Sequence, residues 1–111
     1  MPESQESNVE LIKWSEEAGL VKLGLPSDLD LPMAPPLVDS LRHAFAVGDS
    51  IEVVAEAVER VSTACIQALL AASRLAAEGR QGFVIVTPSE AVVDACTDLG
   101  LGEWLKQWRR S

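Results

Sequence analysis

RVSTACIQALL, residues 60–70, leads from a short apolar approach through small hydroxyl residues into a long helix rich in alanine and leucine. Ser62 and Thr63 are residue types that cap helices, because their hydroxyl groups accept a hydrogen bond from an unpaired backbone N–H. The partial positive charge of a helix start also attracts polar groups from outside. Since the chain has no other concentrated chemistry, this segment is the predicted functional site, and it indicates a protein-binding surface.

The periodicity on both sides of this helix predicts alternating strands and helices. Strands are expected at 9–14 and 20–25, as a hairpin around a break at 15–19, and then at 51–55 and 82–86. Helices are expected at about 34–47, 63–78, 88–99 and 101–108. This order predicts an α/β fold with a mixed, mostly parallel sheet of four to five strands, packed with about four helices.

Local signals predict the ends and faces of these elements. Gly48 and Gly79 are expected to end the first two helices, Gly48 in a left-handed conformation. Residues 82–86 are apolar without alternation, which is typical of a central strand covered by helices on both faces. Thr87 is expected to cap the third helix in a capping box with Glu90. The buried face of the long helix is expected to contain Ile66, Leu69, Leu70, Ser73 and Ala77.

Composition limits the classes of function. The 111 residues have room for one domain, preceded by a polar, flexible tail at residues 1–8. Nine Lys and Arg against 17 Asp and Glu give a formal net charge of -8, which argues against nucleic acid as a partner. The sequence begins without a secretory signal and contains no apolar run long enough to span a bilayer, so we expect a cytoplasmic protein without direct membrane insertion.

No pattern in the sequence indicates catalysis, a metal or a cofactor. Cys65 and Cys96 both fall in apolar helical patterns and are expected to be buried thiols, although a helix start can also make a thiol such as Cys65 reactive. His43 is expected at the surface. The carboxylates do not converge as an acid and base pair would, and no nucleotide-binding or nucleophile motif is present. We therefore predict that the protein is not an enzyme and has no catalytic residues.

The order of elements and three local patterns resemble one family, the STAS domains, named for sulfate transporters and anti-sigma factor antagonists. The resemblance covers about residues 9–105 and rests on LDLPMAPPL (29–37), on VERVST (58–63) and on TPSE (87–90) followed by LGL (99–101). It implies the SpoIIAA-like fold for a single STAS domain at residues 9–111. It also implies binding of another protein through the start of the long helix.

The resemblance further implies how binding would be regulated, and the sequence departs from that pattern. In regulatory STAS domains the long helix begins Asp-Ser-Ser-Gly and the second serine is phosphorylated; the matching residues here are Ser62, Thr63, Ala64 and Cys65. Ala64 has no hydroxyl group, so this phosphorylation switch cannot operate at that position. Val54 also stands where the family often has an aspartate, and Ser27 replaces a frequent glycine.

These observations together predict a partner-binding surface formed by the start of the long helix and the preceding loop at 28–33. Its residues are expected to be Asp30, Met33, Ser62, Thr63, Ala64, Cys65 and Ile66. Ser62 is the expected helix cap, Thr63 the central contact, and both are possible phosphorylation sites.

Three kinds of partner fit the resemblance: a switch kinase that acts as an anti-sigma factor, a chemotaxis-type signalling protein, or an ABC ATPase. The last alternative follows because STAS proteins of bacterial lipid-transport ABC systems also carry a threonine at the place of Thr63, where it touches the ATPase. A homodimer and a small ligand at the helix start remain open. Trp104 and Trp108 share one helical face, which either packs on the sheet, where it would cover Trp14, or anchors a partner.

Overall fold

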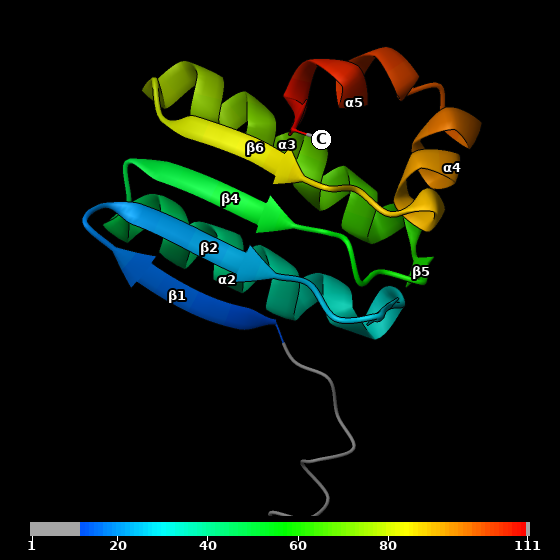
Figure 1. Cartoon of the computed structure of the whole chain (residues 1–111), viewed down its shortest axis with the longest axis horizontal. Helices are drawn as coiled ribbons and strands as arrows, with labels where there is room; N and C mark the ends of the chain where they lie inside the picture. Colours follow the sequence, from blue (N-terminus) through cyan, green and yellow to red (C-terminus); the bar gives the residue numbers. More distant parts are fainter. Residues whose placement is uncertain (1–11, 111) are drawn as a thin grey trace, which may run out of the picture.

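A five-stranded sheet forms one layer of the protein in the computed structural model, which describes residues 12–110. The strands are β1 (Lys13–Glu17), β2 (Leu20–Gly24), β4 (Ser50–Val54), β6 (Gly82–Val86) and β7 (Arg109–Arg110), arranged in the order β1-β2-β4-β6-β7. β1 is antiparallel to β2, and all other neighbours are parallel. Figure 1 shows the hairpin at one edge and β6 beside the C-terminal helix.

Four α-helices of the described residues complete the fold and confirm the predicted class. They are α2 (Ala34–Val47), α3 (Thr63–Gly79), α4 (Glu90–Asp98) and α5 (Gly102–Trp108). A second, two-stranded sheet pairs β3 (Asp28–Leu29) with β5 (Arg60–Val61), and a short 3-10 helix, η1 (Leu31–Met33), leads into α2. Figure 1 shows α2 and α3 side by side behind the main sheet.

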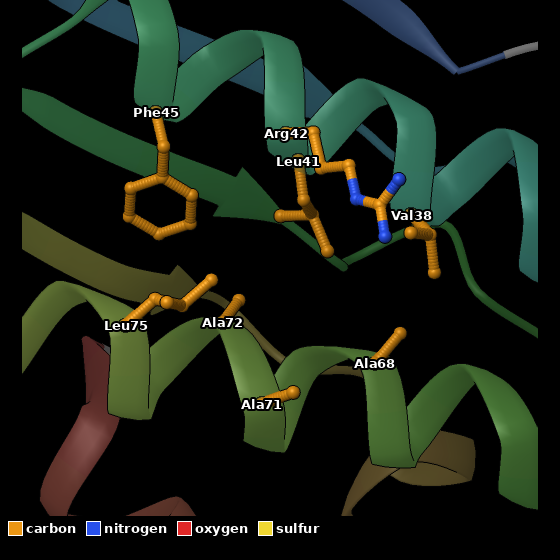
Figure 2. A pocket seen from close by; sticks show the side chains of 8 residues that line it. All are labelled: Val38, Leu41, Arg42, Phe45, Ala68, Ala71, Ala72 and Leu75. Atoms are coloured by element: carbon orange, nitrogen blue, oxygen red, sulfur yellow. The ribbon is translucent and has the colours of Figure 1, made fainter.

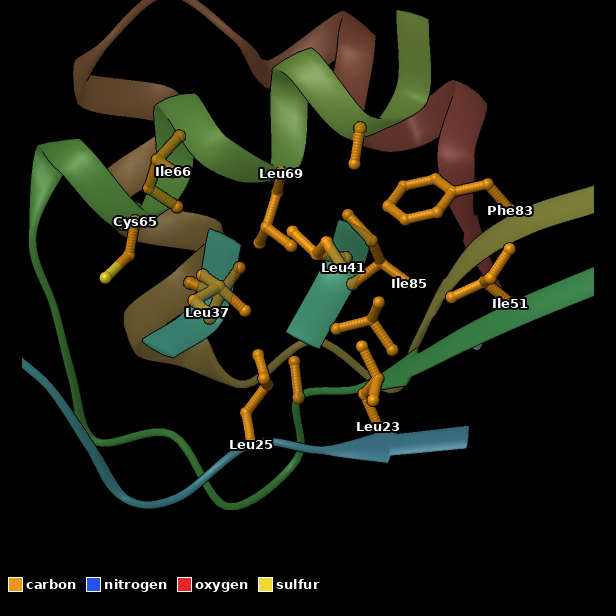
Figure 3. Packing of buried hydrophobic residues seen from close by; sticks show 14 of the residues in the cluster. Leu23, Leu25, Leu37, Leu41, Ile51, Cys65, Ile66, Leu69, Phe83 and Ile85 are labelled. Atoms are coloured by element: carbon orange, nitrogen blue, oxygen red, sulfur yellow. The ribbon is translucent and has the colours of Figure 1, made fainter. Parts of the chain in front are cut away.

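The core lies between one face of the sheet and the helices. Side chains alternate along each parallel strand, so that Ile51 and Val53 are buried while Glu52 and Val54 are only half-buried. β6 repeats this pattern with Phe83 and Ile85 inward. The expectation that β6 is covered on both faces is therefore wrong: among residues 12–110 the helices lie behind the sheet (Figure 1), and the outward residues Val84 and Val86 are only half-buried. Figure 3 shows the inward leucine and isoleucine side chains meeting those of α2 and α3.

The buried face of α3 differs from the predicted one at its C-terminal end. Ile66, Leu69 and Ser73 are buried as expected, and Cys65, Ala72 and Ala76 join them. Leu70 is half-buried and Ala77 is exposed, so the prediction was wrong for Ala77. A stripe spaced by three and four residues passes through Ala76, and the next residue along the chain is rotated away by about 100°.

The turns contain two further departures from the predictions. β1 continues through Glu17, and only Ala18 and Gly19, with φ of 54° and 87°, form the hairpin turn. Two residues with positive φ match the right-handed twist of a tight hairpin. Gly48 has an extended conformation and leaves room for the hairpin, since a Cβ there would lie 2.6 Å from Val21 Cγ2. α3 ends at Gly79 as predicted, and the residue after it, Arg80, is left-handed with φ of 57°.

α4 begins later than the sequence predicted. Its N-cap is Ser89, whose hydroxyl oxygen accepts a hydrogen bond from Val92 N at 3.3 Å. Thr87 has φ of 49° and donates its backbone N–H to Arg110 O at 2.9 Å, so it belongs to the strand end and does not cap the helix. The prediction of a Thr87 capping box is therefore wrong, because a nearer hydroxyl takes the capping position.

The tryptophans of α5 pack within the molecule. Trp104 Nε1 donates to Ser73 Oγ of α3 at 2.9 Å, and the Trp108 ring meets the Phe83 ring edge-on at 5.9 Å. Trp14 is 40% exposed, and the centroid of its ring lies 4.7 Å from that of His43 in α2. Its strand, β1, is at the opposite edge of the sheet from α5. The expectation that the closing helix covers Trp14 is wrong, because β1 and α5 flank different edges. The predicted tail at residues 1–8 lies outside the described residues.

Candidate functional site

The N-terminus of α3 is organised by Ser62. Its hydroxyl oxygen accepts from Cys65 N at 3.3 Å, and its carbonyl oxygen accepts from Ile66 N at 3.1 Å. These contacts satisfy the third and fourth N–H groups of the helix, as expected for a serine cap. The predicted capping role of Ser62 is confirmed.

The segment before α2 is fastened to this helix start. Ser62 N donates to Leu29 O at 2.8 Å, and the Cys65 thiol lies 3.9 Å from Asp30 O, within the range of a weak sulfur hydrogen bond. Pairing of β3 with β5 sets Asp28 opposite Arg60 in the same region. The two segments that the sequence analysis placed at one surface, 28–33 and 62–66, are thus held together by backbone contacts.

The predicted site residues divide into an outer and an inner group. Asp30 and Thr63 are exposed, and Met33, Ser62 and Ala64 are half-buried. Cys65 and Ile66 have 0% of their surface exposed and belong to the hydrophobic core. The expectation that Cys65 and Ile66 touch a partner is therefore wrong, because a helix of 3.6 residues per turn directs these two positions toward the sheet.

The outer group can receive a hydrogen-bond acceptor from another molecule. Within residues 12–110, the backbone N–H groups of Thr63 and Ala64 have no hydrogen-bond acceptor. The first turn of α3 contains no acidic side chain, so the partial positive charge of this helix end is not offset from within the turn. We call the surface formed by Asp30, Met33, Ser62, Thr63 and Ala64 the α3 surface.

Charged residues surround the α3 surface, and most of them are acidic. Asp28, Asp30, Glu59 and Arg60 are all exposed and belong to β3, β5 or the residues next to them. Glu59 N and Arg60 N both donate to Ser27 O, at 2.7 and 3.0 Å, which fixes the backbone that presents these side chains. A partner with basic side chains would match this rim.

Other residues considered from the sequence do not assemble into a site. Among residues 12–110, no three His, Cys, Asp or Glu side chains are grouped as metal ligands. Cys65 and Cys96 are free and buried, which confirms the predicted buried thiols, and burial raises the pKa of the Cys96 thiol. In the described part of the chain, no helix has both the length and the apolar character needed to cross a bilayer.

The sequence did not predict a hollow of about 350 Å³ between α2 and α3, whose lining includes the core residues Leu41 and Ala72. Three of its lining residues are alanines of α3, namely Ala68, Ala71 and Ala72. Alanine at these spacings could have indicated a shallow place on the helix surface. The leucines next to these alanines predicted only the buried face of the helix.

Comparison with known proteins agrees with this geometry. The chain is similar to the structure of the anti-sigma factor antagonist SpoIIAA in its unphosphorylated form, with a TM-score of 0.74, 16% identity and coverage of 89% of this chain and 85% of the other. The Bacillus SpoIIAA structure in the phosphorylated form gives a TM-score of 0.71 at 15% identity, covering 89% and 88%. A STAS domain protein from Planctomyces limnophilus gives 0.73 at 18%, covering 91% and 89%.

No sequence among curated proteins matches the chain. Residues 12–107 match the family model described as "Mlab, STAS domain". This match includes every element of the main sheet except β7, and all four α-helices up to residue 107. The protein belongs to the STAS domain family.

Proposed function

We propose that this STAS domain is a non-catalytic regulatory module that binds another protein through the α3 surface. The supporting observation is the exposed Thr63 at a helix start where the N–H groups of Thr63 and Ala64 have no acceptor among the described residues, beside Asp30 on an anchored neighbouring segment. Docking there requires no rearrangement of the core, since Ser62 and the β3 backbone already hold both segments. Structures similar in fold include anti-sigma factor antagonists.

The chemistry of the α3 surface favours a partner that binds without a phosphate switch at Ala64. A methyl side chain at that position allows close approach of another backbone but accepts no phosphoryl group. The partner would be a switch kinase of the anti-sigma factor type or a chemotaxis-type signalling protein. It would present a hydrogen-bond acceptor to the N–H groups of Thr63 and Ala64, and basic side chains to the acidic rim.

Thr63 is the better of the two candidate phosphorylation sites. Its side chain is exposed, whereas the Ser62 hydroxyl is half-buried and occupied as the helix cap. A phosphate on Thr63 would be stabilised by the helix start, yet it would place about two negative charges at the centre of the contact surface. Phosphorylation would therefore release the partner. Incubation with candidate kinases and mass-spectrometric mapping of the phosphate test this assignment.

The contact is tested by substitution of Thr63 in the full chain. Partners are captured on the immobilised protein from a lysate of the source organism, and their affinities are then measured with purified proteins. Thr63→Glu should weaken binding at least tenfold, because a carboxylate occupies the free N–H groups and repels an acceptor. Ala64→Ser should leave the affinity nearly unchanged when no kinase is present. Equal affinities for wild type and Thr63→Glu would refute the proposed contact.

A second candidate function has support from the family comparison. The matching family model is described as "Mlab, STAS domain". The resemblance noted in the sequence also implies that Thr63 stands where STAS proteins of lipid-transport ABC systems have a threonine against the ATPase. In this alternative the chain is a structural subunit that stabilises an ABC ATPase. Co-purification separates the two functions, since an ATPase subunit supports the transporter and a histidine-kinase-like protein supports signalling.

A further inference from the structure

The groove between α2 and α3 has a shape that can receive a copy of itself. It is lined from α2 by Val38, Leu41, Arg42 and Phe45, and from α3 by Ala68, Ala71, Ala72 and Leu75. Figure 2 shows the short alanine side chains opposite Val38 and Leu41, with Leu75 standing at the end of the groove near Phe45. Leu75 is 54% exposed, although α3 also contributes residues to the core. One face therefore carries both a projecting apolar side chain and a hollow.

The charges of the two helices that form this groove are balanced, in contrast to the chain as a whole. Asp39 and Arg42 of α2, and Arg74 and Glu78 of α3, are exposed. Their charges sum to zero, whereas the whole chain has a formal charge of -8. Because net charge opposes self-association, a second copy is repelled least where the local charge is neutral.

These four charged groups are also available for contacts between molecules. Within residues 12–110, the ion pairs are Lys106–Glu103 and Arg110–Glu52, both away from the groove. In a two-fold arrangement each residue of one copy faces the same surface of the other, so two acids and two bases can pair reciprocally. Figure 2 shows the Arg42 guanidinium beside Val38, on the α2 side of the groove.

We propose that the α2–α3 groove is a homodimer interface, with Leu75 of each copy seated on the alanines of the other. α3 has 17 residues and is about 25 Å long. Neighbouring helices lie about 10 Å apart, so α2 and α3 side by side form a face about 20 Å wide. Over the length of α3 this face has an area of about 500 Å² per copy, and a dimer would bury about 1,000 Å² in total. This area is at the low end for specific interfaces, so the dimer should be weak and reversible, with a dissociation constant on the order of tens of micromolar.

Sedimentation equilibrium of the full chain, from low micromolar to millimolar concentration, tests the proposal. Wild type should pass reversibly from monomer to dimer. Leu75→Asp should weaken the dimer at least tenfold, because two charges per dimer would enter an apolar contact. Val47→Asp is the matched control: Val47 is 47% exposed on α2 but does not line the groove, and its substitution should leave dimerisation unchanged.

A second variant separates loss of contact from loss of folding. Ala71→Gln fills the hollow with a good helix former at an exposed position, so it should weaken the dimer while the circular dichroism and melting temperature stay close to wild type. Amide chemical-shift changes on dilution should centre on Ala68, Ala71 and Leu75. A wild type that remains monomeric at millimolar concentration, or a dimer unaffected by Leu75→Asp, would overturn the proposal.

The dimer and the proposed partner contact can fail independently. Thr63 does not line the groove, so Thr63→Glu should impair partner binding and leave the dimerisation constant unchanged. Leu75→Asp should weaken dimerisation and leave partner binding unchanged, provided that the protein concentration in the binding measurement is below the dissociation constant of the dimer.

Discussion

α3 and α4 begin with the same cap but end their first turns differently. Ser62 and Ser89 each accept a hydrogen bond from the N–H three residues later, and both distances are 3.3 Å. α4 then places Glu90 in its first turn, whereas α3 has no acidic residue there. The carboxylate of α4 complements its own helix end, while the corresponding polarity of α3 is left for an external group. Capping alone is therefore structural in both helices, and the difference after the cap distinguishes the candidate site.

The largest expected effect comes from the buried side of the first turn of α3. Ile66→Ala should lower the free energy of unfolding by about 2–5 kcal/mol, because it leaves a cavity beneath the helix start. Thr63→Ala, three positions earlier on the exposed side, should change it by less than about 0.5 kcal/mol. Urea unfolding of both variants measures this contrast. Similar losses in the two variants would mean that Thr63 has a structural role, which would weaken its assignment as a contact residue.

An intermediate effect is expected from removal of either cap. Ser62→Ala and Ser89→Ala should each cost about 1 kcal/mol, since each leaves one N–H of the first turn without its side-chain acceptor. Near-equal losses in urea unfolding would support the view that the caps are structurally equivalent. Ser62→Asp, which keeps an acceptor at the capping position, serves as the rescue control. If Ser62→Ala lost no stability while Ser89→Ala did, the Ser62 hydroxyl would have to be assigned to partner binding instead of capping.

Periodicity predicted the order of the main elements because each of them has a clear apolar stripe or an alternating pattern. The ends were harder, since they depend on competition between neighbouring groups. Thr87 and Ser89 are both good capping residues, and the competition is settled only by the contact of Thr87 N with Arg110, a residue distant in sequence. Gly48 was assigned a left-handed conformation although its real constraint is the approach of Val21 from the hairpin. Both constraints come from contacts between residues distant in sequence, so local sequence patterns do not predict them.

For the candidate site, the sequence predicted which segments lie together but not which of their residues are buried. The pairing of segment 28–33 with the start of α3 was anticipated, and the contact of Ser62 N with Leu29 O explains it physically. The sequence could not separate Ala64 from Cys65, because both are small and lie in one apolar run. One step of about 100° around the helix takes the chain from a half-buried methyl group to a core thiol. The α2–α3 groove was missed because it depends on the distance between two helices.

The smallest expected effect tests the difference in charge between the two helix starts directly. Thr63→Glu gives α3 the acidic first turn that α4 already has, and it should raise the free energy of unfolding by about 0.3–1 kcal/mol. Glu90→Gln should lower it by a similar amount, and both changes should shrink in high salt because the groups are exposed. Thr63→Gln introduces a side chain of the same shape as glutamate but without its charge. It is the control for both the free energy of unfolding and the affinity for the partner. A gain in stability from Thr63→Glu together with a loss of partner binding would show that an acidic residue in this first turn stabilises the fold but prevents the contact. A loss of stability would instead mean that the helix start is not electropositive, and the comparison with α4 would fail.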